Sequence, residues 1–425
     1  MFEFEKDFEL EIGQSSVKKK SNKFMLIWKI SGDEETGGIS SSPLKYKDIV
    51  IFGCGDSYLY ALNINTGKMV WKFRANKAFL DAKPSEDSGI IYIGSYDGYV
   101  YAVNGETGED IWRFKTGGKI YGSCNVNDGK VYFGSQDSYV YAVDSKTGKE
   151  VWRFKTGAEV GSTPTIYKEV LYIGSYDENL YALDPETGRE IWRFRAGGNI
   201  SNPLPYFIDD NILYIGCIDG NVYAIDLEQR RDKWRFRTDS WILASPRPFE
   251  NFIYFVSSDG NMYCIEKEGR QVWRFMTDAY MDGSTDVLIH NGILYYGSSN
   301  GNFYALNAMT GKELWRFKTE GPVISCPVLH ERKLYFGSFD CNFYCIDLNG
   351  KEVWRFKTSS SVKWESPPES EWFEFEVDVK EEPEEAKREY GERVNVIEAE
   401  SIESEYDLKS EYQFKSEYKT ESEYK

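Results

Sequence analysis

One tryptophan-containing signature recurs through most of this chain and restricts its fold more than any other feature. Each copy has two Tyr-rich segments separated by an Asp-Gly-type turn, then a Thr-Gly turn and a segment of the type Trp-Arg-Phe-Lys. Nine tryptophans, beginning with Trp28, follow one another at steps of 39 to 43 residues. A period of about 40 residues with short strand-like segments and frequent turn signals predicts four β-strands per unit.

The copy between residues 160 and 195 shows the expected unit most clearly. Its strands are predicted at Val160–Ile166, Val170–Gly174, Asn179–Asp184 and Glu190–Arg195. Such a unit presents apolar residues on both faces, so its neighbours have to cover it. Packing successive four-stranded sheets around an axis does this and leaves only short sheet edges, which predicts an all-β fold, a β-propeller. A linear stack is the rival arrangement, but solenoid repeats are usually shorter or helical.

The number of blades depends on how the two ends of the chain are used. Eight complete units run from residue 39 to 357, which predicts eight blades, and an extra outer-strand signature, Phe24–Ile30, precedes them. In an eight-bladed ring this segment packs at the seam, as an added strand or in place of Glu352–Lys357. The alternative is nine blades, the last a composite that includes strands from 2–12 and 373–378. That composite places acids opposite acids at an energetic cost, so eight is preferred.

The turn before each tryptophan matches a known sequence motif. It reads ALDPETGREIW from Ala182 to Trp192 and AVDSKTGKEVW from Ala142 to Trp152. The pattern Ala-x-Asp-x-x-x-Gly-x-x-x-Trp resembles the tryptophan-docking motif of the PQQ-like (quinoprotein and BamB-like) β-propeller repeat family. The resemblance covers about residues 24–358, and it implies an eight-bladed propeller in which each tryptophan is wedged between adjacent blades.

A few positions depart from this motif. Arg230 replaces the glycine of the fifth unit, and Cys264 and Cys345 replace the alanine in units that are one residue short. A tryptophan buries a large area, and a small residue opposite its ring makes room for it, so a structural role is assigned to these tryptophans. The docking residues of the eight units are Trp71, Trp112, Trp152, Trp192, Trp234, Trp273, Trp315 and Trp354.

Side chains that carry catalytic chemistry are scarce. The two histidines, His290 and His330, fall in turns between first and second strands, and no metal-ligand cluster, serine-hydrolase elbow or phosphate loop is found. Quinoprotein dehydrogenases bind PQQ and Ca²⁺ at the propeller centre and carry an adjacent Cys-Cys pair, whereas no two cysteines adjoin here. We therefore expect no enzyme activity, no metal and no cofactor. A PQQ-dependent dehydrogenase with Ca²⁺ is the alternative.

An acidic or amide residue recurs in every turn between the second and third strands. With one per unit, these residues are spread around the ring, whereas Ca²⁺ needs six or more oxygens converging at about 2.4 Å. Asp at such a position stabilises its own chain reversal, which favours a turn-forming role over a metal site. The eight residues are Asp56, Asp97, Asp137, Asp177, Asp219, Asp259, Asn300 and Asp340.

The segments that lead from one unit to the next indicate a binding face. In a propeller they share one side with the turns between second and third strands, and they vary among otherwise similar units. Large side chains stand there at Phe79, Tyr121, Trp241 and Tyr280. They predict an aromatic-lined entrance to the channel that binds a protein or a small ligand. The alternative is that these side chains plug the axis.

Charge divides the chain into an N-terminal extension (1–23), the propeller (24–358) and an acidic tail (359–425). The tail carries 21 acidic and 9 basic residues, the propeller 43 and 37, and the extension five of each. No basic stripe remains in the propeller, which argues against a nucleic-acid surface. The apolar stretches are too short to span a bilayer, which argues against a membrane protein.

The tail is expected to form strand or helix in part near its start and ends in a Ser-Glu-Tyr repeat with a six-residue period. This composition fits either a solvated chain or a strand that adds to a partner's sheet, so a role in association is predicted.

The seven cysteines form no CxxC pair, and the acidic, aromatic start does not resemble a secretory signal. Both features predict a cytoplasmic protein with reduced thiols.

Overall fold

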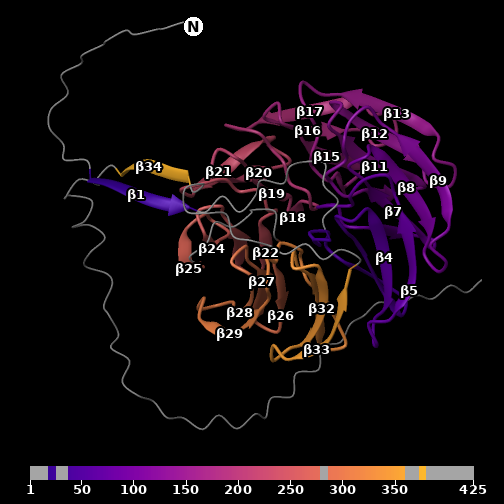
Figure 1. Ribbon diagram of the computed structural model, residues 1–425. Coiled ribbons are helices and arrows are strands. Elements are labelled where there is room, and N and C mark those ends of the chain that lie inside the picture. The colour runs from indigo at the N-terminus through magenta and orange to yellow at the C-terminus, as the bar shows by residue number, and fades with distance from the viewer. Residues whose placement is uncertain (1–17, 25–36, 278–285, 359–372, 380–425) are drawn as a thin grey trace, which may run out of the picture. The chain divides into compact units, whose positions relative to one another are not determined.

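The fold is an eight-bladed β-propeller, seen in the computed structural model of the chain (Figure 1). The structure describes residues 18–24, 37–277, 286–358 and 373–379. Within them, all regular structure is β-strand, and eight antiparallel sheets have four strands each. The prediction of eight blades is confirmed, and the alternative of nine is wrong. In the described part of the chain no helix is long and apolar enough to cross a membrane.

Each of the first four blades is a meander whose strands follow the order of the chain. Blade 1 contains β2 (Leu44–Tyr46), β3 (Ile49–Gly53), β4 (Tyr58–Asn63) and β5 (Met69–Arg74). Blade 2 contains β6 (Ser85–Asp87), β7 (Ile90–Gly94), β8 (Tyr99–Asn104) and β9 (Asp110–Lys115). Blade 3 contains β10 (Asn125–Asn127), β11 (Lys130–Ser135), β12 (Tyr139–Asp144) and β13 (Glu150–Lys155). Blade 4 contains β14 (Thr165–Tyr167), β15 (Val170–Gly174), β16 (Asn179–Leu183) and β17 (Glu190–Arg195).

The other four blades repeat this arrangement. Blade 5 contains β18 (Phe207–Asp209), β19 (Ile212–Gly216), β20 (Asn221–Asp226) and β21 (Arg231–Arg237). Blade 6 contains β22 (Arg247–Phe249), β23 (Phe252–Val256), β24 (Asn261–Glu266) and β25 (Gln271–Met276). Blade 7 contains β26 (Leu288–His290), β27 (Ile293–Gly297), β28 (Asn302–Asn307) and β29 (Glu313–Lys318). Blade 8 contains β30 (Val328–His330), β31 (Lys333–Gly337), β32 (Asn342–Asp347) and β33 (Glu352–Lys357).

The hydrophobic core lies between neighbouring blades. Ile51 and Leu59 of blade 1, for example, pack in one buried cluster with Ile91 and Tyr101 of blade 2. Because both faces of each sheet are apolar, a single blade would expose them to water, and the ring covers every face with the next blade.

The tryptophans on the fourth strands reach from their own blade to the next one. Within its blade Trp152 stands opposite Ala142. Its indole N–H donates across the junction to the Pro185 carbonyl oxygen at 2.8 Å. The same bond joins Trp71 to Gly105, Trp112 to Ser145, Trp234 to Lys267, Trp273 to Ala308 and Trp315 to Leu348.

The ring closes between blades 8 and 1, which lie side by side in Figure 1. The Trp354 ring packs on Gly67 of blade 1, where an added Cβ would lie 2.6 Å from the ring, so only glycine leaves room for it. Phe343 stacks on Phe52 across the same junction, with ring centroids 4.1 Å apart. Because β33 (Glu352–Lys357) is the outer strand of blade 8, the option that Phe24–Ile30 replaces it is wrong. Residues 25–30 lie outside the described residues.

Strands from the two ends of the chain form a separate two-stranded sheet. It pairs β1 (Lys18–Phe24) with β34 (Phe373–Val379). The sequence KKKSNKF is basic and FEFEVDV is acidic. The predicted strand 373–378 is confirmed, and the predicted strand 2–12 lies outside the described residues.

Candidate functional site

The recurrent acids of the second-to-third-strand turns are bound to the turns themselves. Asp177 Oδ1 accepts the amide N–H of Asn179 at 3.1 Å, and Oδ2 accepts the Tyr181 hydroxyl at 2.6 Å and the Gly157 amide at 2.6 Å. The turn-forming interpretation is confirmed. The same Asp–Tyr bond joins Asp56 to Tyr60, Asp97 to Tyr101, Asp137 to Tyr141, Asp219 to Tyr223, Asp259 to Tyr263 and Asp340 to Tyr344.

The pKa values of Asp177 and Tyr181 both differ from their ordinary values. Burial raises the pKa of Asp177, but hydrogen bonds from Tyr181, Asn179 and the Gly157 amide lower it by more, so the pKa lies below its usual value. The pKa of Tyr181 is raised to about 12, first by burial and then by the bond to Asp177. The Asp177 carboxylate is therefore an ionised acceptor at neutral pH, held by the fold rather than offered to a ligand.

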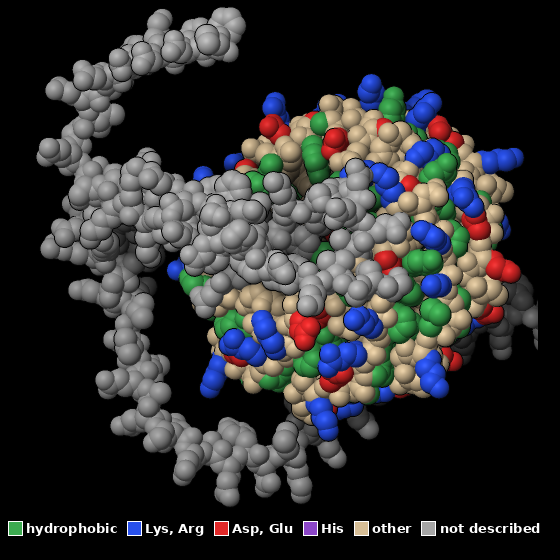
Figure 2. Space-filling model, in the orientation of Figure 1, with side chains coloured by type: hydrophobic (Ala, Val, Ile, Leu, Met, Phe, Trp, Pro, Cys, Tyr) green, Lys and Arg blue, Asp and Glu red, His purple; other side chains and the backbone are tan. Residues whose placement is uncertain are grey.

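Six arginines of the outer strands each pair with an acid three residues earlier. Arg193 donates to the Glu190 carboxylate at 2.7 and 2.6 Å and lies over the Tyr181 ring at 5.0 Å. On the side of the propeller seen in Figure 2, basic side chains are scattered among acidic ones. The equivalent ion pairs are Arg113–Asp110, Arg153–Glu150, Arg235–Asp232, Arg316–Glu313 and Arg355–Glu352.

Phe79 does not belong to the predicted aromatic entrance. Its side chain is fully buried and contacts Tyr101 between blades 1 and 2, with ring centroids 5.9 Å apart. It lies against Gly53, as Ile120 lies against Gly94 in the next blade, so it fills a packing position that is aliphatic elsewhere. A buried residue of this kind offers no surface to a partner, and its assignment to the binding face is corrected.

The other three residues of the predicted aromatic entrance are Trp241, Tyr121 and Tyr280. Trp241 precedes the buried Ile242, and 49% of its side chain is exposed. Tyr121 is partly buried and contacts the Tyr96 ring at 4.7 Å. Tyr280 lies outside the described residues. Trp241 and Tyr121 both stand on what we call the loop face. This face is made of the turns between second and third strands and of the segments that lead from each fourth strand into the next blade.

A group of tyrosines and carboxylates surrounds Tyr121 on the loop face. Tyr96 donates its hydroxyl to Asp81 Oδ2 at 2.5 Å. The pKa of Tyr121 is raised to about 12, first by burial and then by the nearby Tyr176, Asp81 and Glu159. Burial also raises the pKa of Asp81, against the bond from Tyr96. These groups therefore form one electrostatically coupled cluster.

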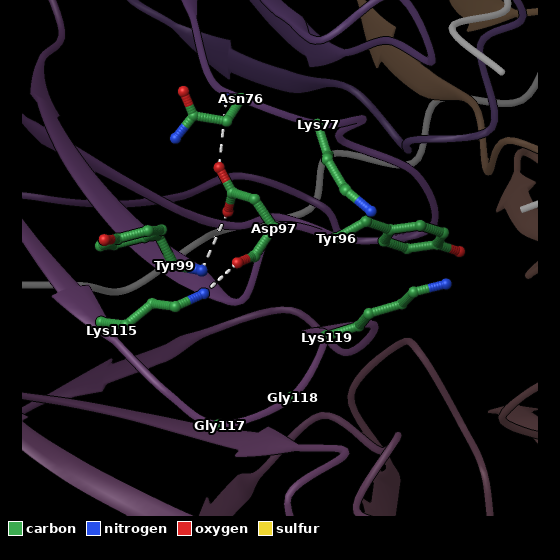
Figure 3. Close-up of a pocket in the computed structure, with 9 residues that line it drawn as sticks. All are labelled: Asn76, Lys77, Tyr96, Asp97, Tyr99, Lys115, Gly117, Gly118 and Lys119. Atoms are coloured by element: carbon green, nitrogen blue, oxygen red, sulfur yellow. Dashed lines mark hydrogen bonds between the residues drawn. The ribbon is translucent and has the colours of Figure 1, made fainter. Parts of the chain in front are cut away.

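A hollow of about 460 Å³ opens beside this cluster, over blade 2 and between the segments that enter and leave that blade (Figure 3). Lys77 and Lys119 extend near the Tyr96 ring from loops on either side of it, and Lys119 lies 5.3 Å from the ring centroid. Lys115 contacts the Tyr99 ring at 4.6 Å and donates to the Asp97 carbonyl oxygen. The other lining residues are Asn76, Gly117 and Gly118.

Reasoning from the sequence missed Lys77, Lys119 and Tyr96. A signal for them exists, because the repeats can be aligned with one another. Lys119 occupies the position of Glu159 and Trp241 in other units, where the carbonyl oxygen accepts a backbone N–H and the side chain varies. Variation at a position whose backbone alone serves the fold marks a surface open to function.

Two family models match parts of the chain. The model described as "Beta-alanine-activating enzyme, beta-propeller" matches residues 85–281. The model described as "Outer membrane protein assembly factor BamB" matches residues 264–374. The mouse beta-alanine-activating enzyme is 30% identical over 104 residues, which are 23% of this chain and 10% of the enzyme. The chain thus matches about a tenth of that relative's length.

Solved structures share the fold at low sequence identity. BamB from Moraxella catarrhalis superposes with a TM-score of 0.62 at 18% identity, covering 77% of this chain and 96% of BamB. The quinohemoprotein alcohol dehydrogenase from Comamonas testosteroni gives a TM-score of 0.60 at 15% identity, covering 78% of this chain and 76% of the dehydrogenase.

The four-stranded blades and their tryptophan junctions define the class of this protein as an eight-bladed β-propeller. The BamB family model makes residues 264–374 similar to the PQQ-like β-propeller repeats, in agreement with the resemblance of the tryptophan-docking motif.

Proposed function

We propose that this chain is a non-catalytic scaffold that binds a protein partner through its loop face. A small ligand is the second candidate occupant of the same face. The observation that carries the proposal is the concentration of irregular aromatic and charged side chains on this face, over a backbone that repeats from blade to blade. In a repeat protein, side chains that break the pattern without serving the fold are available for recognition.

Trp241 is the strongest single anchor for such a partner. Its side chain is 49% exposed, while its carbonyl oxygen accepts the Ser258 amide at 2.8 Å, so the backbone is fixed and the ring is presented. Exposed tryptophans on rigid surfaces are enriched among residues that dominate binding energy. The similarity to BamB, an assembly factor by its description, is consistent with a scaffold role.

The test compares partner capture by the full chain and by two variants. Trp241→Ala should reduce capture of a specific partner by at least tenfold, about 1.4 kcal/mol or more. The matched control is Met309→Ala, which truncates a 53% exposed apolar side chain in a turn between third and fourth strands. Equal recovery by both variants and the unmodified chain would reject the loop face as the docking surface.

A quinoprotein dehydrogenase is the alternative function, and the structural likeness to the quinohemoprotein alcohol dehydrogenase favours it. The described residues do not fit its cofactor well. Among them no group of three His, Cys, Asp or Glu side chains is placed to hold a metal, and the turn acids are held by their own turns. Incubation with PQQ and Ca²⁺ tests this alternative. Cofactor retained through gel filtration, together with dye-linked alcohol oxidation, would replace the scaffold proposal.

The acidic tail is proposed to contribute to association. Its net charge of −12 and its Ser-Glu-Tyr repeat motivate this role. A chain ending at residue 358 should recover less partner than the full chain. Equal recovery would remove the tail from the proposal.

We also propose that the protein works in the cytoplasm. All seven cysteines are free thiols, and six are buried. Cell fractionation with a tagged full-length chain tests this placement, and recovery of the protein in an oxidising compartment would contradict it.

A further inference from the structure

We propose that the outer strand of blade 6 binds an extended, acidic segment of a partner protein, which adds a fifth strand to the blade. This strand, β25 (Gln271–Met276), has a hydrogen-bonded neighbour strand only on the side of β24 among the described residues (Figure 1). An open sheet edge presents a row of backbone N–H and C=O groups, with which an extended segment can pair. The proposal goes beyond the proposed function, because β25 and the Trp241 ring lie on different elements.

The outer strands of six other blades carry charges that protect their edges. In each of them an arginine forms an ion pair with an acid three residues earlier. Each of these strands also ends in a lysine or an arginine. Charged residues on an edge strand, lysine above all, discourage pairing with another chain. These six edges are therefore poor sites for strand addition.

The strand β25 departs from this pattern at both ends. Gln271 stands where the six strands have an acid, and Met276 stands where they have a lysine or an arginine. Met276 is 59% exposed, and Val272 is 42% exposed. The edge of blade 6 thus combines exposed apolar residues with a single charge, which is on Arg274.

Arg274 has no acid within ion-pair distance in the part of the chain that the structure describes. Its guanidinium lies near the hydroxyl of Tyr263, which is a neutral group. In blade 7 the equivalent Arg316 donates to the Glu313 carboxylate at 2.7 and 2.5 Å. The replacement of the acid by Gln271 therefore leaves a positive charge that an incoming carboxylate can neutralise.

Blade 1 also lacks the acid, but its edge keeps two charges. Its outer strand, β5, starts with Met69 and carries Lys72 and Arg74. Both cations lie over the Tyr58 ring, at 4.2 and 5.6 Å from the ring centroid. The ring stabilises these cations, and two charges on one short edge still oppose pairing. The edge of blade 6 is therefore the better site.

The charge of β25 selects an acidic strand over a second copy of this chain. An acid opposite Arg274 in a paired strand is stabilising, whereas like charges in that arrangement are destabilising. Two copies of β25 paired antiparallel about the middle of the strand would bring their Arg274 side chains close together. Residues two positions apart share a face of a strand, so an apolar residue two places from the acid contacts Met276. The partner segment therefore contains an acid with an apolar residue two positions away.

The experiment measures binding of two fluorescein-labelled peptides to the full chain by anisotropy. One peptide is Thr-Val-Thr-Glu-Thr-Val-Thr, and the other has lysine in place of glutamate. The lysine peptide should bind at least tenfold more weakly than the glutamate peptide. Hydrogen exchange followed by mass spectrometry should show that the glutamate peptide protects the amides of β25 and not those of β5. Equal binding of the two peptides, or protection of another strand, would overturn the proposal.

Three variants test the role of the unpaired charge. Gln271→Glu gives Arg274 the acid that six other blades have, so the fold should be kept while binding of the glutamate peptide weakens about tenfold. Arg274→Glu should reverse the preference, so that the lysine peptide binds more tightly than the glutamate peptide. The matched control is Arg316→Gln in blade 7, which should change binding less than twofold. Binding that is unchanged in the first two variants would reject Arg274 as the contact.

Sedimentation velocity of the full chain without peptide tests the competing occupant, a second copy. Met276→Lys restores the charge at the end of the strand and should leave the sedimentation of the chain unchanged. A dimer that this substitution dissociates would assign the edge to a second copy and rule out the acidic partner. Glutamate-peptide binding that persists in Trp241→Ala would keep this proposal even where the loop face fails as a docking surface.

Discussion

The junction between blades 2 and 3 follows the repeat, whereas the junction between blades 4 and 5 departs from it. Trp112 is 9% exposed, packs on Gly148 and donates its N–H to Ser145 at 2.8 Å. At the other junction Arg230 replaces the glycine, and no hydrogen bond of the Trp192 indole N–H is found among the described residues.

The backbone nevertheless takes the same path at both junctions. The amides of Gly148 and Arg230 donate to Asp144 and Asp226 at 2.8 and 2.7 Å, and their φ angles are 66° and 56°. The turn thus accommodates an arginine in the left-handed backbone conformation. The two junctions differ in the contact that the tryptophan makes. In the docking motif the backbone of the turn is therefore the same at both junctions, whereas the packing of the tryptophan varies.

The largest expected effect on the free energy of unfolding comes from removing Trp112, the tryptophan at the junction between blades 2 and 3. Trp112→Ala should lower the free energy of unfolding by about 3–5 kcal/mol, because it removes a buried ring and leaves a cavity. Trp192→Ala should cost about 1 kcal/mol less, since its N–H bond is missing. Urea unfolding followed by far-ultraviolet circular dichroism measures both. Equal losses would show that the two junctions are energetically alike.

The second-largest expected effect comes from placing arginine, the residue found at position 230, at position 148 in the junction between blades 2 and 3. Gly148→Arg adds a Cβ within 2.7 Å of the Trp112 ring at a left-handed φ. We expect a cost of about 1–3 kcal/mol in the same unfolding assay. An unchanged free energy of unfolding would mean that the packing of Trp112 accommodates arginine as well as the packing of Trp192 does.

A smaller effect is expected on the pH dependence of stability, through Tyr92 at the junction between blades 2 and 3. Tyr92 donates its hydroxyl to the Ser145 carbonyl at 3.0 Å, and its pKa is raised to about 12, chiefly by burial. Because its folded pKa lies above the ordinary value of about 10, its contribution is complete below pH 10 and is lost as pH rises through 12. Tyr92→Phe should flatten the loss of stability between pH 10 and 12. An unchanged slope would contradict this assignment.

The smallest expected effect is at Arg230. Arg230→Gly relieves a left-handed backbone but makes the unfolded chain more flexible, and these terms nearly cancel. A gain of about 0.5 kcal/mol is expected in urea unfolding. A loss above about 1 kcal/mol would show that the Arg230 side chain stabilises the irregular junction through its own contacts.

The repeat made the blades predictable, because one spacing is copied eight times and each copy supports the same interpretation. The loop face was harder to predict. Phe79 looked like a surface aromatic when it was considered alone, although its alignment with Ile120 and Val160 places it in the packing between blades. The pairing of Lys18–Phe24 with Phe373–Val379 joins segments more than 300 residues apart, and no periodic signal links them.

The seam between the last and first blades has a consequence for how the molecule opens. Within the part of the chain that the structure describes, no peptide bond crosses it, and the buried indole N–H of Trp354 has no hydrogen-bond acceptor. The polar contacts across it include the Thr358 hydroxyl, which donates to the Gly37 carbonyl oxygen at 2.8 Å, and the Ile39 amide, which donates to the Ser338 carbonyl oxygen at 3.1 Å. Native-state hydrogen exchange should therefore start at this joint, and a circular permutant that covalently links blades 8 and 1 should protect it.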